Sequence, residues 1–398
     1  MKKRLFAALL AVSLFILHVV PAAAFVPNGH KDQTPDGYNM DDYMRAVVFM
    51  ETEDENGVKN GEKIVSFFNG HYSPDDPESW SYFYYDHENA IFYISGVFWT
   101  DGEEKRVSAL YLYGMDLVGE LDLSGMNELY EVYCDFNKLT SIDASGCSTL
   151  RVLTCKNNVL DELWLSGCTS LDLFDCSYNA LTALDASECV SVTDIECANN
   201  KLAELDVSGC SALQWLNCSH NLLSDIDVSN NASLAHLCCF GNCLTALDLS
   251  NNPALPFDMI RAVGQGHIGY SNYGYINEND FWVSMDAAVA EPDQEEEFLG
   301  WYSEDGERIS SALELDSAST AITRVYARFT GAEYVPGDAN GDGLVNAADA
   351  LLVLRDSMDI MELPEAAVSA CDLDHSGTID AADALLILRY ALGIIDSF

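Results

Sequence analysis

The chain of 398 residues has few basic side chains. Its 19 lysines and arginines face 64 aspartates and glutamates, which gives a formal net charge of −45 at pH 7. Such a charge repels nucleic acids and anionic lipid surfaces and favours solubility and cations. We therefore exclude nucleic acid as a partner. After residue 24 no apolar run is long enough to span a bilayer, so membrane insertion is not expected.

Motifs of known catalytic sites are also missing. The sequence contains no G-x-S-x-G, H-E-x-x-H or P-loop pattern and no C-x-x-C pair. Acidic residues are so numerous that paired carboxylates occur by chance, so no such pair indicates a glycosidase. We predict that the chain is not an enzyme. The question stays open for residues 25–107, the one part without an assigned architecture.

The first 24 residues have the pattern of a secretion signal. A basic start at residues 2–4 precedes an apolar run from Leu5 to Val20, and three alanines follow at 22–24. This order is typical of a signal peptide that is cleaved before Phe25. The sequence therefore predicts a secreted, extracellular protein.

A repeat of 21 residues runs from 129 to 255. One unit reads Leu150-x-x-Leu153-x-Cys155-x-x-Asn158-x-Leu160. A single unit cannot bury its apolar residues alone, so stacked units share one core and each adds a short parallel strand. The asparagines fit a corner at which their amides bond backbone groups. Their column is Asn137, Asn158, Asn179, Asn200, Asn221 and Asn242.

This repeat resembles the leucine-rich repeat, whose pattern is L-x-x-L-x-L-x-x-N-x-L. The resemblance covers six full units and a degenerate unit around 121–124. It implies a leucine-rich-repeat solenoid with parallel β rungs over residues 108–255. Residues 25–107 are then predicted to be a cap over the first open rung. A small ligand-binding module is the alternative for this segment.

Two columns of cysteine follow the same period. Side chains in register on rungs about 4.8 Å apart point the same way. Their sulfurs then stay beyond the roughly 2.05 Å of a disulfide unless the rotamers turn. We interpret them as buried thiols that pack as small apolar groups, with a metal ladder or redox relay as the alternative. The columns are Cys134, Cys155, Cys176, Cys197, Cys218 and Cys239, and Cys147, Cys168, Cys189 and Cys210, continued by Asn231 and Asn252.

Strand positions that alternate with the buried ones are predicted to face solvent. They combine aromatic and acidic side chains, which suits a protein or glycan ligand. A solvated face with some aromatic packing is the alternative. The predicted surface residues are Tyr133, Lys156, Asp175, Glu196, Trp215, His236 and Phe240.

Residues 256–331 leave the repeat and are predicted to be rich in strands. Alternating segments at 280–289 and 321–329 have the pattern of strands. The run from Phe298 to Tyr302 is similar to a small β-repeat module of bacterial surface proteins. A β-rich cap at the end of the solenoid is the alternative. A linker is expected at 332–337.

The end of the chain holds two copies of one short acidic pattern, which start at Asp338 and Asp372, 34 residues apart. Oxygen side chains occupy positions 1, 3, 5, 9 and 12, glycine occupies position 6, and position 7 offers its carbonyl, as a calcium loop requires. An acidic surface loop is the alternative for one match, but two matches in one register favour metal loops. We predict two calcium ions, held by Asp338, Asn340, Asp342, Leu344, Asn346 and Asp349 and by Asp372, Asp374, Ser376, Thr378, Asp380 and Asp383.

Each loop leads into the same amphipathic run, which predicts a duplicated helix. With aspartate at position 12 and no long helix before either loop, residues 338–398 resemble a type I dockerin. The resemblance implies an all-α, calcium-dependent module that binds cohesin modules of a scaffoldin in a cellulosome-type complex. The implied contacts are Ala347, Ala348, Leu354 and Arg355, and Ala381, Ala382, Leu388 and Arg389. Because the two sets match, two binding orientations related by a half turn are expected.

The sequence therefore predicts a secreted, non-catalytic protein of a polysaccharide-degrading complex, docked by its dockerin. Its solenoid is expected to present a surface to a protein or a glycan. Two alternatives stay open. Residues 25–107 could form a divergent polysaccharide-active hydrolase, or the repeats could form an extracellular adhesin or inhibitor.

Overall fold

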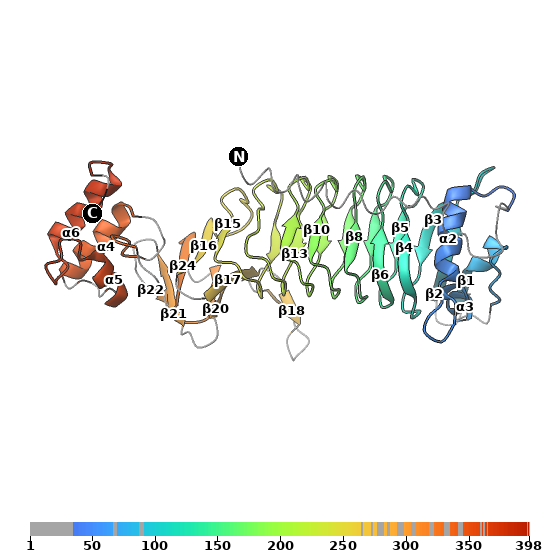
Figure 1. Cartoon of the computed structure of the whole chain (residues 1–398), viewed down its shortest axis with the longest axis horizontal. Helices are drawn as coiled ribbons and strands as arrows, with labels where there is room; N and C mark the ends of the chain where they lie inside the picture. The colour runs from blue at the N-terminus through green and yellow to red at the C-terminus, as the bar shows by residue number, and fades with distance from the viewer. Residues whose placement is uncertain are drawn as a thin grey trace.

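In a computed structural model, the described chain forms a long rod (Figure 1). Helices and a hairpin lie at one end, stacked strands fill the middle, and a helical module lies at the other end. The predicted signal peptide, residues 1–24, lies outside the described part. The structure describes residues 35–66, 70–86, 91–263, 266–271, 274–276, 282–284, 287–292, 298–303, 308–317, 322–329, 335–340, 345–358, 360, 363, 365–395 and 397.

The N-terminal region joins the solenoid through a shared sheet. Its strands β1, β2 and β3 pair antiparallel, and β3 then pairs in parallel with the first strand of the repeat. Its buried side chains, Tyr43 and Val47 among them, belong to the same apolar cluster as the repeat. The elements are α2 (Met40–Glu51), α3 (Asn60–Ser66), the 3-10 helix η2 (Pro77–Trp80), β1 (Ser81–Asp86), β2 (Ile91–Trp99) and β3 (Val107–Tyr111).

Parallel strands then follow one per repeat unit along a 12-stranded sheet. Residues 21 apart are direct partners, as in the series Val132, Leu153 and Phe174. The predicted solenoid with parallel rungs is therefore confirmed. Its strands in this sheet are β5 (Glu131–Tyr133), β7 (Val152–Thr154), β9 (Leu173–Asp175), β11 (Asp194–Glu196), β13 (Trp215–Asn217) and β14 (His236–Cys238).

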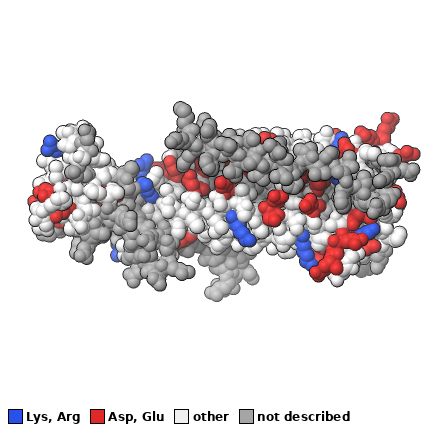
Figure 2. Space-filling view, in the orientation of Figure 1, with Lys and Arg blue, Asp and Glu red and all other residues white. Residues whose placement is uncertain are grey.

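A second strand in most units belongs to smaller sheets. β4, β6 and β8 form one of them, and β10 pairs with β12. On the face drawn in Figure 2, acidic side chains predominate over basic ones. These strands are β4 (Val118–Asp122), β6 (Lys138–Asp143), β8 (Glu162–Trp164), β10 (Ala183–Asp185), β12 (Glu204–Asp206) and β15 (Ala246–Asp248).

The asparagine column fastens the rungs to one another. The Asn158 amide nitrogen donates to the carbonyl oxygens of Cys134 (2.9 Å) and Cys155 (3.0 Å). Its side-chain oxygen accepts from the Leu139 N–H at 3.0 Å. Equivalent bonds recur at Asn179, Asn200, Asn221 and Asn242. Each asparagine thus satisfies buried backbone groups in two adjacent rungs, as its periodicity predicts.

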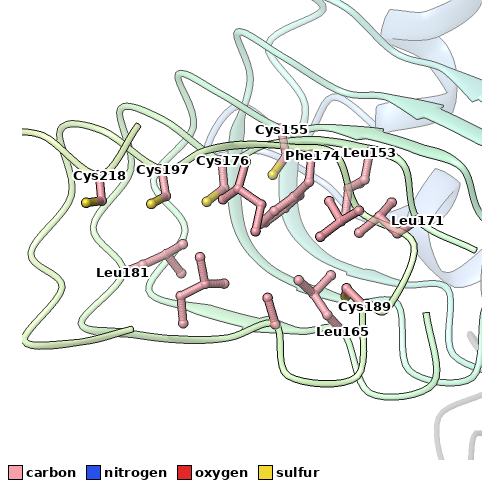
Figure 3. Packing of buried hydrophobic residues seen from close by; sticks show 14 of the residues in the cluster. Leu153, Cys155, Leu165, Leu171, Phe174, Cys176, Leu181, Cys189, Cys197 and Cys218 are labelled. Atoms are coloured by element: carbon pink, nitrogen blue, oxygen red, sulfur yellow. The ribbon is translucent and has the colours of Figure 1, made fainter. Parts of the chain in front are cut away.

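The cysteine columns lie inside the core, where the predicted burial is confirmed. Figure 3 shows Cys155, Cys176, Cys197 and Cys218 in one line beside Phe174. All the cysteines are free thiols. Burial raises the pKa of the Cys147 and Cys168 thiols to about 12. Burial thus favours the protonated thiol, as expected for side chains that pack as small apolar groups.

Past the repeat, the described strands divide between two larger sheets. β17, β20 and β23 continue the 12-stranded sheet, whereas β15, β16, β24, β21 and β22 form another. The single strand expected at 280–289 is two strands, because β19 pairs with β18 while β20 pairs with β17. The bounds are β16 (Met259–Val263), β17 (Gly266–Ser271), β18 (Gly274–Ile276), β19 (Trp282–Ser284), β20 (Ala287–Pro292), β21 (Phe298–Ser303), β22 (Arg308–Ser310), β23 (Glu314–Asp316) and β24 (Arg324–Phe329).

The C-terminal module contains α4 (Ala347–Ser357), α5 (Glu365–Cys371) and α6 (Ala381–Ala391). α4 packs against α6. The module has an apolar cluster of its own, which includes Leu352 and Ile387 and is distinct from that of the solenoid. The predicted all-α module with a duplicated helix is confirmed. Among the described helices, none has the length and apolar character needed to cross a membrane.

Candidate calcium and docking site

Each acidic loop ends by capping the helix that follows it. Asn346 and Asp380, at loop position 9, are the N-caps of α4 and α6, and their side chains accept from the N–H groups of Ala348 (2.8 Å) and Ala382 (2.6 Å). In turn, the carboxylates at position 12 accept from the N–H groups of the two N-cap residues, at 2.8 and 2.9 Å. Both loops therefore contain a complete capping box, which explains why each helix begins inside its loop.

The carboxylates at position 12 also hold the start of each loop. Asp383 Oδ1 accepts from the N–H groups of Leu373 (2.8 Å) and Asp374 (3.2 Å). Asp349 Oδ1 accepts from Ala339 (3.0 Å) and Asn340 (3.2 Å) in the same way. Both side chains are fully buried. One short carboxylate thus ties the two ends of its loop together.

The second loop wraps around its own first carboxylate. Asp372 accepts from the N–H groups of Ser376 and Gly377, both at 2.9 Å. The turn requires positive φ at His375 (57°) and at Gly377 (88°), where glycine at position 6 is the least strained residue. The predicted turn at position 6 is therefore present in this loop.

Three carboxylates of the second loop converge. Oxygen atoms of Asp372, Asp374 and Asp383 lie within 4.8 Å of one another. Like charges at this distance repel, and a bound cation would relieve the repulsion. The Ser376 hydroxyl and the Thr378 carbonyl oxygen lie 2.9 Å apart in the same loop. An all-oxygen donor set of this kind fits a hard cation such as calcium.

The first loop buries its oxygen groups more deeply. Asp338 and Asn340 are almost fully buried, and Asn346 is half-buried. The predicted ligands Asp342 and Leu344 lie outside the described residues. Burial, and next the carboxylates of Asp349 and Asp338, raise the pKa of the Cys371 thiol to about 12. Carboxylates that are buried this far need compensation, which backbone N–H groups and a cation can supply.

The predicted cohesin contacts fall into two groups. The alanines Ala347, Ala381 and Ala382 are exposed, and Ala348 is half-buried. Arg389 is exposed and Arg355 half-buried. Leu354 and Leu388 are different, because both pack partly against the module's own apolar cluster. The two leucines therefore offer a partner less surface than the sequence pattern suggests.

The sequence interpretation missed a second duplicated set of side chains. Leu351 and Leu385 are 39% and 55% exposed, Met358 and Leu392 are 52% and 65% exposed, and Ile360 and Ile394 are 64% and 59% exposed. Each pair has the 34-residue spacing of the loops, a signal that was available in the sequence. We interpret this duplicated set of exposed apolar side chains as a candidate binding surface.

The predicted solenoid surface is only partly open. His236 is exposed, whereas Tyr133, Asp175, Glu196 and Trp215 are half-buried because neighbouring rungs cover them. Lys156 and Phe240, also half-buried, lie just beyond β7 and β14 rather than within them.

Several of these surface residues bind one another. Glu196 accepts from Trp215 Nε1 at 2.7 Å, and burial raises the pKa of its carboxyl. Lys156 pairs with Asp175 at 3.3 Å. Tyr133 stacks on Tyr111 at a ring distance of 5.5 Å. Many of the polar and aromatic groups on this face are therefore already engaged by neighbouring side chains.

Comparison with known families identifies the C-terminal module. The model of the dockerin type I domain matches residues 336–392. The chain thus carries a type I dockerin domain, a class of calcium-binding domain whose partners are cohesins. This implies association with an extracellular cellulosome-type complex. The predicted combination of a dockerin with a leucine-rich-repeat solenoid is confirmed.

Solved structures similar to the chain are leucine-rich-repeat proteins, and no curated protein matches. A leucine-rich-repeat protein of Leptospira interrogans is 18% identical with a TM-score of 0.30, covering 33% of this chain and 36% of that one. The functional domain of InlJ from Listeria monocytogenes, which includes a cysteine ladder, is 25% identical with a TM-score of 0.25, covering 37% and 47%. The chain thus spans less than half of either structure.

Proposed function

We propose that this chain is a secreted, non-catalytic binding protein that a calcium-loaded dockerin attaches to a cellulosome-type polysaccharide-degrading complex. The observation that carries the proposal is the duplicated loop and helix, in which both loops have the same carboxylate bonds and capping box. The family match over 336–392 supports docking as the role of this module.

The dockerin binds two calcium ions, one in each loop. The side-chain or carbonyl oxygens predicted above would hold them, with Asp372, Asp374 and Asp383 already converging in the second loop. The ions supply positive charge that neutralises crowded carboxylates. Since the predicted ligands Asp349 and Asp383 also complete the capping boxes of α4 and α6, ion binding and helix formation are coupled.

The cohesin contacts the exposed alanines at the start of α4 or α6, together with the exposed apolar pairs. Equivalent residues are present in both halves, which supports two binding orientations. Leu351 and Leu385, both exposed and 34 residues apart, illustrate the match. The half that is not engaged stays exposed in each orientation.

Residues 25–107 form a cap, and the solenoid presents a surface to a protein or a glycan. The continuous sheet and the shared apolar cluster support the cap. A cap of this kind covers apolar side chains of the first rung that would otherwise face solvent.

Calcium titration and cohesin capture test this proposal. Calorimetry on the chelator-treated full chain should give two ions per chain, and Asp372→Ala combined with Asp374→Ala should reduce this to one. Capture by a panel of immobilised type I cohesins should identify a partner. Failure of every cohesin to retain the calcium-loaded chain would contradict the proposed docking role.

A further inference from the structure

One backbone position in each solenoid unit is left-handed. The residue before each column asparagine has φ of 57° at Phe136, 54° at Asn157, 58° at Tyr178, 57° at Asn199, 53° at His220 and 68° at Gly241. The asparagine causes this, because its amide folds back to the carbonyl three residues earlier, as from Asn179 to Cys176. Asparagine, histidine and glycine tolerate the conformation, whereas phenylalanine and tyrosine seldom adopt it.

Three of these six positions nevertheless hold an aromatic side chain. Phe136, Tyr178 and His220, here called the aromatic row, occupy alternate units. Phe136 is 46% and Tyr178 is 55% exposed, and His220 is also exposed. At Phe136 and Tyr178 about half of the side chain stays exposed, so the fold gains limited burial in return for the strain. Strain that the fold itself does not need points to a function.

The aromatic row is held in register by the backbone. The N–H groups of Phe136, Tyr178 and His220 donate to carbonyl oxygens in the next rung at 3.0, 2.9 and 2.9 Å. With rungs about 4.8 Å apart, successive members of the row lie about 9.6 Å apart.

Neighbouring residues extend the row at both ends. The Tyr113 ring lies 5.2 Å from Phe136, and the Phe240 ring lies 4.8 Å from His220. A side chain at Gly241 would meet the His220 ring at 2.6 Å, so glycine leaves room for the imidazole.

We propose that the aromatic row binds an extended β-1,4-linked hexose chain. Successive sugars in such a chain are turned over, so the same ring face recurs at every second sugar, a spacing close to that of two rungs. The apolar face of a pyranose packs on an aromatic ring. Asn157 and Asn199 occupy the intervening rungs and offer amides to sugar hydroxyls. None of the three row residues is acidic, which suits a neutral glycan; beside the His220 end, Glu291 accepts from the Gly241 N–H at 2.7 Å.

This inference rests on the proposed function and names the ligand class of its solenoid. Its test is the triple variant Phe136→Asn, Tyr178→Asn and His220→Asn in the full chain, which places the residue of the intervening rungs at all three positions. Binding to cellohexaose by calorimetry and to amorphous cellulose by depletion should weaken about tenfold or more. The melting temperature should rise, since asparagine relieves the left-handed strain.

The control is Tyr130→Asn, which removes an aromatic side chain of similar exposure, 45%, outside the row. It should leave glycan affinity unchanged, and amylose, an α-linked glucan, should bind at least tenfold more weakly than the β-linked chain. Three binding results overturn the inference: no binding of cellulose by the unsubstituted chain, equal affinity of the triple variant, or an equal loss in the control. A lower melting temperature of the triple variant also overturns it, because the aromatic side chains would then serve the fold. Cohesin capture is measured on the same preparations. A chain that binds cohesin but not cellulose contradicts only the glycan inference, whereas a chain that does not bind cohesin contradicts the docking role.

Discussion

The solenoid and the dockerin are both built from repeated units, but they satisfy their buried polar groups in different ways. In the solenoid a neutral amide, such as that of Asn158, bonds the Cys134 carbonyl of one rung and the Cys155 carbonyl of the next. In the dockerin a charged carboxylate, such as Asp383, bonds backbone groups within one loop. A neutral ladder is complete in itself, whereas converging carboxylates need a cation. We therefore expect only the dockerin end of the rod to depend on metal.

The largest effect is expected on cohesin binding by variants of the dockerin. Lysine substitutions at Ala347 and Ala348 alone should reduce cohesin affinity only about twofold, because the second orientation remains available. Adding lysines at Ala381 and Ala382 should abolish capture, measured on immobilised cohesin. The melting of the solenoid should not change in either variant. A large loss from the first pair alone would show that only one orientation is used.

A smaller but substantial effect is expected inside the solenoid. Asn179→Ala leaves the Cys155 and Cys176 carbonyls and the Leu160 N–H without their side-chain partner. Because three buried backbone groups lose a hydrogen-bond partner, the free energy of unfolding should fall by about 3 kcal/mol. Urea unfolding with and without calcium should give the same loss. The matched control is Asn230→Ala at an exposed asparagine, which should change the free energy of unfolding little. If the loss caused by Asn179→Ala depended on calcium, the solenoid would not be independent of the metal.

A modest effect is expected at a cap of the dockerin. Asp380→Ala removes the N-cap of α6 together with a predicted calcium ligand, and the loss of the cap alone should destabilise the calcium-loaded module by about 1 kcal/mol. Asp380→Asn should retain most of that stability, since Asn346 caps α4 in the other loop. Thermal unfolding followed by the helical circular dichroism signal measures both. Equal destabilisation by the two substitutions would mean that charge, rather than capping, is what this position supplies.

The smallest effect is expected from pH on the solenoid thiols. Burial raises the pKa of Cys147 and Cys168 from 9.0 to about 12, so the folded state holds their protons more tightly than the unfolded state does. This contribution is complete below pH 9 and is lost as the pH rises towards 12. Urea midpoints should therefore be flat near neutrality and fall above about pH 9. Fast alkylation of the folded chain at pH 8 would contradict protonated, buried thiols.

Periodicity explains which features could be predicted from the sequence. A strict period fixes the neighbours of every rung, so the asparagine bonds and the buried thiols follow from the columns. The loop spacing likewise predicts the carboxylate sets. The left-handed aromatic row was not foreseen, because its φ values depend on bonds that the next residue makes. The break in the strand at 280–289 was missed since pairing partners, not local pattern, separate β19 from β20.

One measurement tests the metal dependence of the dockerin most directly: cohesin capture by the full chain in calcium and in excess chelator, with circular dichroism recorded on both samples. The account predicts that chelation abolishes capture and lowers the helical signal, while the solenoid unfolds at the same urea concentration in both. Equal capture in chelator, or a solenoid that unfolds earlier there, would contradict it.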